Sequence, residues 1–104
     1  MPTGTQNKPL QALIIEDSEF DATLLANLLR HGGYEVAWTR VETAASMRAA
    51  LKARKWDIVL SDHQMPEFSA PEALRILQES GLDLPFVIVS GGIGEATAVA
   101  AMKA

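Results

Sequence analysis

The sequence of 104 residues contains no cysteine. This absence excludes disulfides, thiolate nucleophiles and thiolate metal ligands, and it favours a reducing compartment, so we expect a cytoplasmic protein. Long apolar runs are lacking too, because none approaches the roughly 18 residues of a membrane-spanning helix. Residues 1–9 have neither the basic flank nor the apolar stretch of a signal peptide. We therefore expect no association with a membrane.

Positive charge is also scarce. The chain has 9 Lys and Arg against 13 Asp and Glu, so its formal net charge is −4. Nonspecific affinity for nucleic acids comes mostly from basic side chains that neutralise phosphates. We therefore expect no direct binding to DNA or RNA.

The residues that are present have the balance of a single packed domain. Apolar residues make up 48% of the chain and charged residues 21%, which is typical of globular proteins and not of disordered ones. A chain of this length buries only one modest core. We expect residues 1–9 to be a flexible lead-in and residues 10–104 to fold as one domain.

Short apolar runs alternate with amphipathic stretches along that domain. The runs predict strands, and the stretches predict helices because their apolar residues recur at helical spacing. Strands are predicted over residues 10–15, 34–40, 56–60 and 86–89. Helices are predicted after Ser18, over residues 43–54, after Ser69, and over the alanine-rich end from residue 94 or 95. Strands that alternate with helices pair in parallel with right-handed crossovers, so the predicted fold class is α/β with a doubly wound parallel sheet.

Polar side chains follow three of the predicted strands at the point where each strand ends. Glu16 and Asp17 close the first strand, Asp62 closes the third, and Ser90 closes the fourth. Ligands of doubly wound sheets bind outside the carboxyl ends of the strands, so we expect these side chains to lie close together. Neighbouring carboxylates repel one another unless a cation joins them. A set of oxygen ligands without histidine or cysteine favours Mg²⁺.

The same pattern is compatible with phosphoryl transfer. Asp62 can act as a carboxylate nucleophile on phosphorus and form an aspartyl-phosphate, while the metal neutralises the charge of the arriving phosphoryl group. Ser90 would then donate its hydroxyl to a phosphoryl oxygen. The alternative is that these are ordinary turn residues, since loops after strands favour Asp and Ser. The coincidence of three such motifs, each after an apolar strand, favours a functional site.

Four segments carry a resemblance to a known family. They are LIIEDS (13–18), IVLSDHQMP (58–66), LPFVIVSGG (84–92) and AVAAMKA (98–104). With these segments in this order and at this spacing, the sequence resembles the receiver domain of two-component response regulators from about residue 10 to its end. The resemblance implies a flavodoxin-like receiver fold with strand order 2-1-3-4.

The resemblance also implies what each site residue does. Asp62 would accept phosphate from a sensor histidine kinase or a phosphotransfer protein. Asp17, Asp62 and the main-chain carbonyl of Gln64 would ligate Mg²⁺, and Glu16 would contribute through water. Ser90 would be the switch hydroxyl, which moves toward the phosphate and shifts the population between two existing conformations. The signal would then pass to an output domain or a downstream protein by protein contact.

The sequence departs from the family pattern at its C-terminal end. The family's conserved lysine, fifth strand and fifth helix would lie beyond Ala104, so the resemblance is to an incomplete receiver domain, and Lys103 belongs by its motif to the fourth helix. The apolar fourth strand, 86–89, would then be an open edge of the sheet, which is prone to pair with another chain. We expect a homodimer through this edge or an exchange of elements between chains.

Two other functions remain open. An interaction module could keep the fold without being phosphorylated, since the lysine that should bridge Asp62 and the phosphate lies outside this chain. An aspartyl-phosphate phosphohydrolase would place a second acid two residues after its nucleophile, where Gln64 stands. We therefore do not expect an enzyme.

Overall fold

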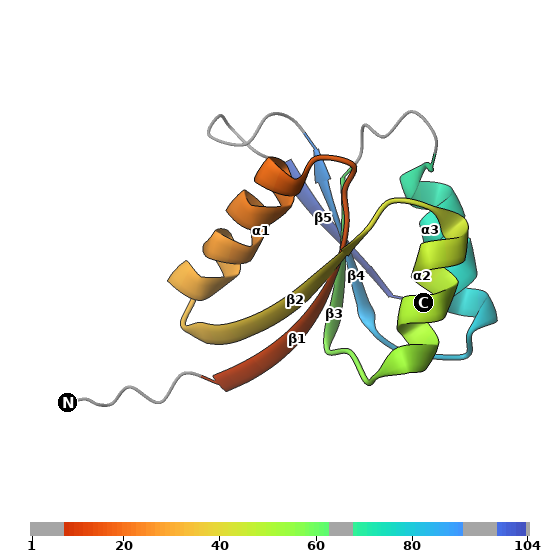
Figure 1. Cartoon of the computed structure of the whole chain (residues 1–104), viewed down its shortest axis with the longest axis horizontal. Helices are drawn as coiled ribbons and strands as arrows, with labels where there is room; N and C mark the ends of the chain where they lie inside the picture. Colours follow the sequence, from red (N-terminus) through yellow and green to blue (C-terminus); the bar gives the residue numbers. More distant parts are fainter. Residues whose placement is uncertain (1–7, 63–67, 91–97, 104) are drawn as a thin grey trace.

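The computed structural model describes residues 8–62, 68–90 and 98–103, with Ser90 and residues 98–103 described by their main chain. One sheet runs through the molecule with helices on both of its faces (Figure 1). The strands are β1 (Lys8–Ile15), β2 (Tyr34–Val41), β3 (Ile58–Asp62), β4 (Pro85–Ser90) and β5 (Ala98–Lys103), and the helices are α1 (Glu19–His31), α2 (Ala44–Ala53) and α3 (Ala70–Glu79). No helix in this part of the chain is long and apolar enough to cross a membrane.

The order of the strands is β2-β1-β3-β4-β5, and the first four pair in parallel. The predicted order 2-1-3-4 and the doubly wound α/β class are therefore confirmed. The chain leaves β1 toward one side for β2 and returns past it to β3, so the strand order reverses between β1 and β3. Such a reversal separates the two crossovers and opens a crevice at the carboxyl ends of the two strands.

The two faces of the sheet have separate apolar cores because successive side chains of a strand point to opposite faces. Leu13 and Ile15 pack with residues of α2 and α3, whereas Ala12 and Ile14 pack with residues of α1. Figure 1 shows this division, with α1 on one side of the sheet and α2 and α3 on the other. The central strands therefore read as continuous apolar runs, since both of their faces are buried.

Each helix begins directly after a residue whose side chain accepts a hydrogen bond from the main chain of the first turn. Ser18 Oγ accepts a hydrogen bond from the Asp21 main-chain nitrogen at 3.3 Å, and Ser69 Oγ accepts one from the Glu72 nitrogen at 3.2 Å. Thr43 and Ser46 form a reciprocal capping box at the start of α2. Each cap satisfies donors that have no partner within the helix, so it fixes where the helix begins.

The prediction of a helix over the alanine-rich end is wrong for residues 98–103. This segment forms β5, which pairs antiparallel with β4 from Pro85↔Lys103 to Ser90↔Ala98. Alanine favours a helix locally, but a lone edge strand leaves a row of main-chain donors and acceptors unpaired. Pairing along β4 satisfies one such row, so the long-range ladder overrides the local preference. The remainder of the predicted helix lies outside the described residues.

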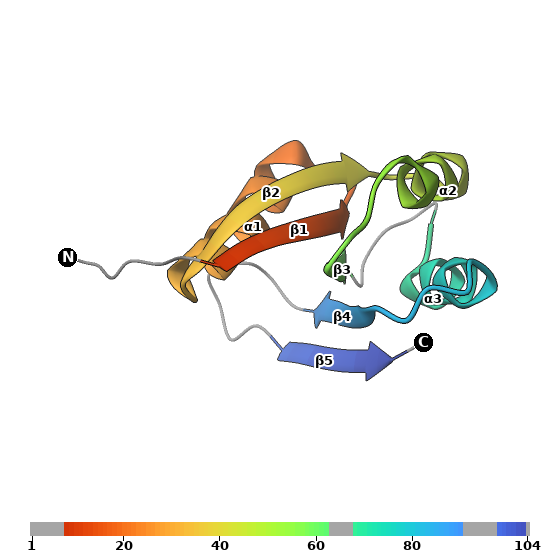
Figure 2. The same cartoon turned by 90° about the horizontal axis from the view of Figure 1, so that it is seen from below.

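Two further expectations change with β5. The resemblance implied a sheet that lacks a fifth strand, whereas the described sheet has five strands, the last antiparallel to its neighbour. The expected open edge at β4 is also wrong, because β4 lies between β3 and β5 (Figure 2). A homodimer through an exposed fourth strand therefore loses its structural basis.

Candidate functional site

The candidate site lies at the carboxyl ends of the two central strands. Ile15, the last residue of β1, pairs with Ser61 on β3. Glu16 and Asp17 directly follow Ile15, and Asp62 directly follows Ser61. Because β1 and β3 are parallel neighbours, their carboxyl ends reach the same edge of the sheet, at the point where the strand order reverses.

Three carboxyl groups meet at this edge. One carboxylate oxygen each from Glu16, Asp17 and Asp62 lies within 4.8 Å of the others. Glu16 is 2% exposed, Asp62 is partly buried, and Asp17 faces solvent. Glu16 therefore lies at the buried bottom of the cluster, Asp62 lies at an intermediate depth, and Asp17 lies on the open side from which a ligand can approach.

Glu16 is the electrostatically unusual member of this acidic cluster. Burial raises its pKa from 4.5 to about 8, and hydrogen bonding and charge repulsion from Asp62, together with a hydrogen bond to Asp17, act in the same direction. A main-chain hydrogen bond from Ser18 acts weakly against them. Among the residues that the structure describes, Glu16 Oε2 is buried without a hydrogen-bond partner. Such an oxygen is costly to leave unsatisfied, so the site favours a proton or a cation here.

The main chain of Glu16 is held by the edge strand. Its nitrogen donates to the Val41 carbonyl oxygen at 3.0 Å, and Arg40 Nη1 donates to its carbonyl oxygen at 3.3 Å. Arg40 also forms an ion pair with Glu42, at 3.5 Å between Nη1 and Oε1. The sequence analysis did not identify Arg40; its place near the end of β2, beside the end of β1, is the signal that could have found it.

Of the other two predicted site residues, Ser90 and Gln64, the structure describes only the main chain of Ser90. Ser90 is the last residue of β4, and the preceding residue, Val89, pairs with Asp62. The main chain of Ser90 is therefore at the same edge of the sheet as the acidic cluster. Gln64, predicted to offer its carbonyl oxygen, lies outside the described residues.

Comparison with known families identifies a family that fits the doubly wound sheet and the acidic cluster. The model of the response regulator receiver domain matches residues 12–104. The chain belongs to this family. The resemblance seen in the four sequence segments is thereby confirmed. Receiver domains are signalling domains of two-component systems. They bind Mg²⁺ at an acidic pocket, and this chain has an acidic cluster.

Individual receiver-domain relatives are diverse proteins. The chain is 32% identical over 82 residues to the two-component response regulator ORR42 of Oryza sativa subsp. japonica, covering 78% of this chain and 61% of that protein. It is 30% identical over 87 residues to the autoinducer 2 sensor kinase/phosphatase LuxQ of Vibrio cholerae, covering 84% of this chain and 10% of LuxQ. A protein-glutamate methylesterase/protein-glutamine glutaminase of Halobacterium salinarum is 31% identical over 81 residues, covering 77% of this chain and 22% of that protein.

The matched region is only part of each relative, so the activity of a whole relative cannot be assigned to this chain. The chain spans 61%, 10% and 22% of the three proteins. What the three matches have in common with this chain is a region of receiver-domain size. The kinase, phosphatase and methylesterase activities in their names therefore give no activity to this receiver domain.

Proposed function

We propose that the chain is the phosphoacceptor domain of a two-component response regulator, phosphorylated on Asp62 with Mg²⁺. The observation that supports this most is the convergence of Glu16, Asp17 and Asp62 within 4.8 Å at the reversal of strand order. The partly buried Asp62 presents a carboxylate nucleophile there. Membership of the receiver family makes the proposal specific.

The donor set fits Mg²⁺. All three side chains offer carboxylate oxygens, which hard divalent cations prefer, and Mg²⁺ needs only a few protein ligands because it keeps waters. Asp17 and Asp62 would be direct ligands with the Gln64 carbonyl, and Glu16 would act through water. Glu16 Oε2, which has no hydrogen-bond partner within the described part of the chain, is the oxygen that a water of the ion would satisfy. When bound, the ion supplies charge neutralisation for phosphoryl transfer.

The proposed step is a displacement at phosphorus. A carboxylate oxygen of Asp62 forms a bond to the phosphorus of a partner's phosphohistidine, and the P–N bond breaks with its electron pair returning to the imidazole nitrogen. The donor is a sensor histidine kinase or a phosphotransfer protein. Ser90 then donates its hydroxyl to a phosphoryl oxygen, which favours one of two conformations that already exist. A downstream domain or protein would bind that conformation.

The test is chemical phosphorylation with acetyl phosphate in the presence of Mg²⁺. We expect a mass gain of one phosphoryl group that hydroxylamine removes, as an acyl phosphate requires. EDTA and the Asp62→Asn substitution should each abolish the gain, whereas Asp83→Asn, which changes an exposed aspartate outside the cluster, should not.

Two results would contradict the proposal. One is a wild-type chain that gains no mass while its Mg²⁺ titration shows an intact site, which would leave an interaction module that keeps the fold without being phosphorylated. The other is a mass gain that Asp62→Asn retains, which would place the phosphoryl group on another residue.

A further inference from the structure

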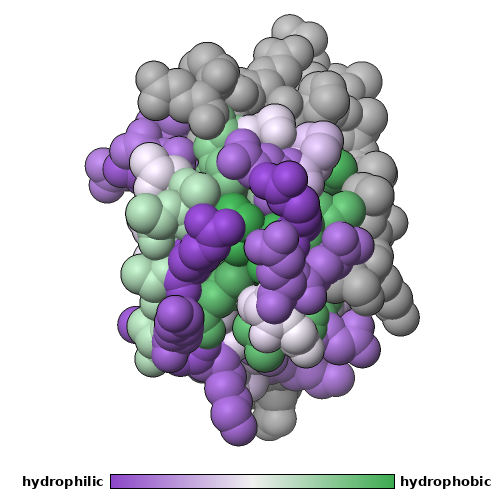
Figure 3. All heavy atoms as spheres, turned by 90° about the vertical axis from the view of Figure 1, so that its right-hand side faces the viewer, coloured by the Kyte–Doolittle hydropathy of each residue, from purple (hydrophilic) through white to green (hydrophobic). Residues whose placement is uncertain are grey.

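A groove runs between the C-terminal halves of α2 and α3 and continues below them toward the start of β4. It consists of two adjoining hollows of about 340 and 500 Å³ that share Leu51, Lys52 and Leu82. We call it the α2–α3 groove; residues from 48–56 and 76–84 line it. Figure 3 faces these helices and shows hydrophobic side chains at the bottom of a cleft between hydrophilic ones.

The floor of the α2–α3 groove is apolar. Leu51, Trp56 and Ile76 belong to the core and are 8%, 5% and 3% exposed, so only a small part of each side chain reaches the groove. Leu82 is different, because it follows the end of α3 and is 38% exposed. Burying Leu82 under a bound segment would remove apolar area from water, which the free protein does not achieve.

The rim of the groove is basic on a chain that is acidic overall. Arg48, Lys52, Arg54 and Lys55 line it, which is four of the nine Lys and Arg of the chain within eight consecutive residues. Among the lining residues that belong to the described part of the chain, only Glu79 and Asp83 oppose them. Four cations against two anions give this rim a positive charge, while the whole chain has a net charge of −4.

These cations have few partners among the residues that the structure describes, and Arg54 Nη1 donates a long hydrogen bond of 3.4 Å to Gln11 Oε1. Arg48 reaches Glu79 at 3.8 Å, but both side chains are more than half exposed, so the pair contributes little and can open. Arg54 stacks on the ring of Trp56, 5.4 Å from its centroid. Within residues 8–62 and 68–90, Lys52 and Lys55 form no ion pair. The rim therefore holds cations that an incoming carboxylate can pair with.

We propose that the α2–α3 groove binds an acidic amphipathic segment of a partner protein. Its apolar side chains would cover Leu82 and the floor at Leu51 and Ile76. Its carboxylates would face Lys52 and Lys55, which is the charge complementarity that selects partners and speeds their encounter. A helix with apolar residues on one stripe fits such a groove between two helices.

Other anionic partners fit the groove less well. Nucleic acid binding depends on many basic contacts to phosphates, and it is opposed by the net charge of −4 and the apolar floor. A membrane surface needs apolar side chains that protrude, whereas Leu51 and Ile76 lie at the bottom of a hollow. The combination of a recessed apolar floor and a basic rim selects a polypeptide.

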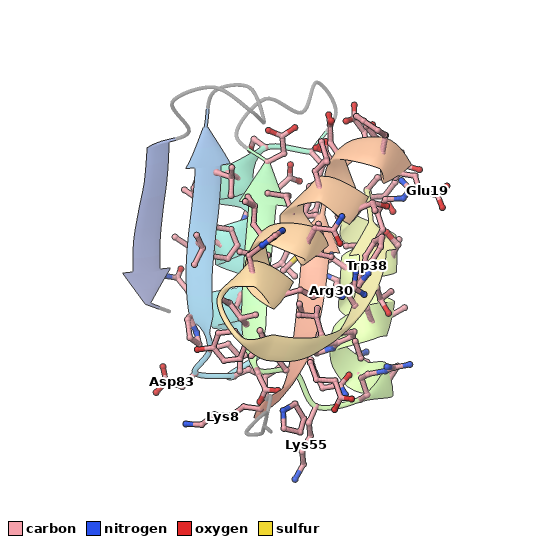
Figure 4. All side chains as sticks on the ribbon, turned by 90° about the vertical axis from the view of Figure 1, so that its left-hand side faces the viewer. Lys8, Glu19, Arg30, Trp38, Lys55 and Asp83 are labelled. Carbon is pink, nitrogen blue, oxygen red and sulfur yellow. The ribbon has the colours of Figure 1, made fainter. Side chains whose placement is uncertain are left out.

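The groove is remote from the acidic cluster. Figure 4 places Lys55 and Asp83 in the lower part of the molecule, whereas Glu19, two residues after Asp17, lies in its upper half. A partner in the groove would leave the carboxyl edge of the sheet open. The inference therefore goes beyond the proposed function and predicts binding that does not require Asp62 to be phosphorylated.

The test is a selection from a random-peptide display library against the chain. We expect enriched peptides to be acidic, with apolar residues three or four positions apart, and to shift the amide resonances of residues 48–55 and 76–84. Lys52→Glu should weaken their binding roughly threefold to fivefold. Its matched control is Arg30→Glu, since Lys52 and Arg30 both lie in the last turn of a helix and both are exposed.

A second pair of variants tests the apolar floor. Leu82→Glu should weaken peptide binding by roughly tenfold or more, because it buries a charge under the ligand. Leu28→Glu, on α1 at 54% exposure, should leave it unchanged. The dispersion of the amide spectrum shows that each variant is folded.

Four outcomes of the peptide experiments would overturn the proposal. They are a library without enriched peptides, enriched peptides without acidic bias, equal binding by Lys52→Glu and Arg30→Glu, and resonance shifts outside the groove. Phosphatidylserine vesicles and a random-sequence DNA duplex are run alongside. Tighter binding of either one at the groove than of any enriched peptide would overturn it too.

Discussion

Arg40 on β2 donates a hydrogen bond from Nη1 to the main-chain oxygen of Glu16, the residue directly after β1, at 3.3 Å. The same nitrogen forms an ion pair with Glu42 Oε1 at 3.5 Å. This contact joins the edge strand to the turn that presents two of the three carboxylates. The position of the acidic cluster therefore depends on a residue that is not part of it.

Arg40→Lys tests this positioning, because it keeps the charge and loses the planar fork of the guanidinium. We expect the free energy of unfolding to fall by about 1 kcal/mol, and the affinity for Mg²⁺ to fall roughly threefold to fivefold. Urea denaturation and a Mg²⁺ titration followed by amide resonances measure the two effects. Arg30→Lys, on the exposed face of α1, is the control. Unchanged Mg²⁺ affinity in Arg40→Lys would show that Arg40 does not position the cluster.

Glu16 predicts a pH dependence for the metal-free protein. Its pKa is raised from 4.5 to about 8 in the folded state, so between these values the folded chain binds more protons than the unfolded chain. Stability from this group is complete below about pH 4.5 and is lost as the pH rises through about 8. The loss should be on the order of a few kcal/mol. Urea denaturation in EDTA across this window measures it.

Two variants isolate the contribution of Glu16. Glu16→Gln should flatten the pH dependence and be more stable than wild type at the upper end of the window. Glu35→Gln, on the exposed side of β2, should keep the wild-type dependence. Added Mg²⁺ should restore stability at high pH in the wild type more than in Glu16→Gln. A pH dependence that Glu16→Gln leaves intact would assign it to other groups.

The sequence predicts those parts of the fold and site that depend on local pattern and parallel topology. Leu13 to Ile15 is apolar on both faces, and it ends at two acids, so both the buried strand and the carboxylates at its end could be predicted. Asp62 could be placed beside them because parallel strands bring their carboxyl ends to one edge. No long-range detail was needed for either step.

What the sequence could not predict comes from contacts between distant residues. The strand over residues 98–103 depends on pairing with β4, and nothing local in an alanine-rich segment opposes a helix. The Arg40 contact depends on a main-chain oxygen 24 positions away, and a main-chain acceptor leaves no mark on residue type. The raised pKa of Glu16 needs the degree of burial, which only the packed structure supplies.

The core on the side of α2 and α3 predicts the cost of a single truncation. Leu77 on α3 is fully buried, so Leu77→Ala removes packed methyl groups and leaves a cavity. We expect the free energy of unfolding to fall by about 2 to 5 kcal/mol. Leu28→Ala makes the same chemical change at a helical residue that is 54% exposed, and it should cost less than about 1 kcal/mol. Urea denaturation compares them, and equal losses would place Leu77 outside the core.

The pairing of β5 with β4 predicts opposite outcomes for two adjacent prolines. Val87 pairs with Ala101 and Ile88 with Ala100. Along an edge strand in an antiparallel pair, consecutive main-chain N–H groups alternate between the partner strand and the outside. Proline removes the N–H, so one of Ala100→Pro and Ala101→Pro should break the ladder and the other should be tolerated. Hydrogen exchange of the β4 amides should accelerate only in the variant whose proline breaks the ladder.

A helix over the same residues predicts a different result for these prolines. Proline in a helix interior removes a hydrogen bond and clashes with the preceding turn at either position, at a cost of about 3 kcal/mol. Both variants would then disturb the segment to a similar extent, and neither would expose β4 selectively. An alternating response therefore requires the strand, and a uniform response would return residues 98–103 to the helix that their alanine content favours.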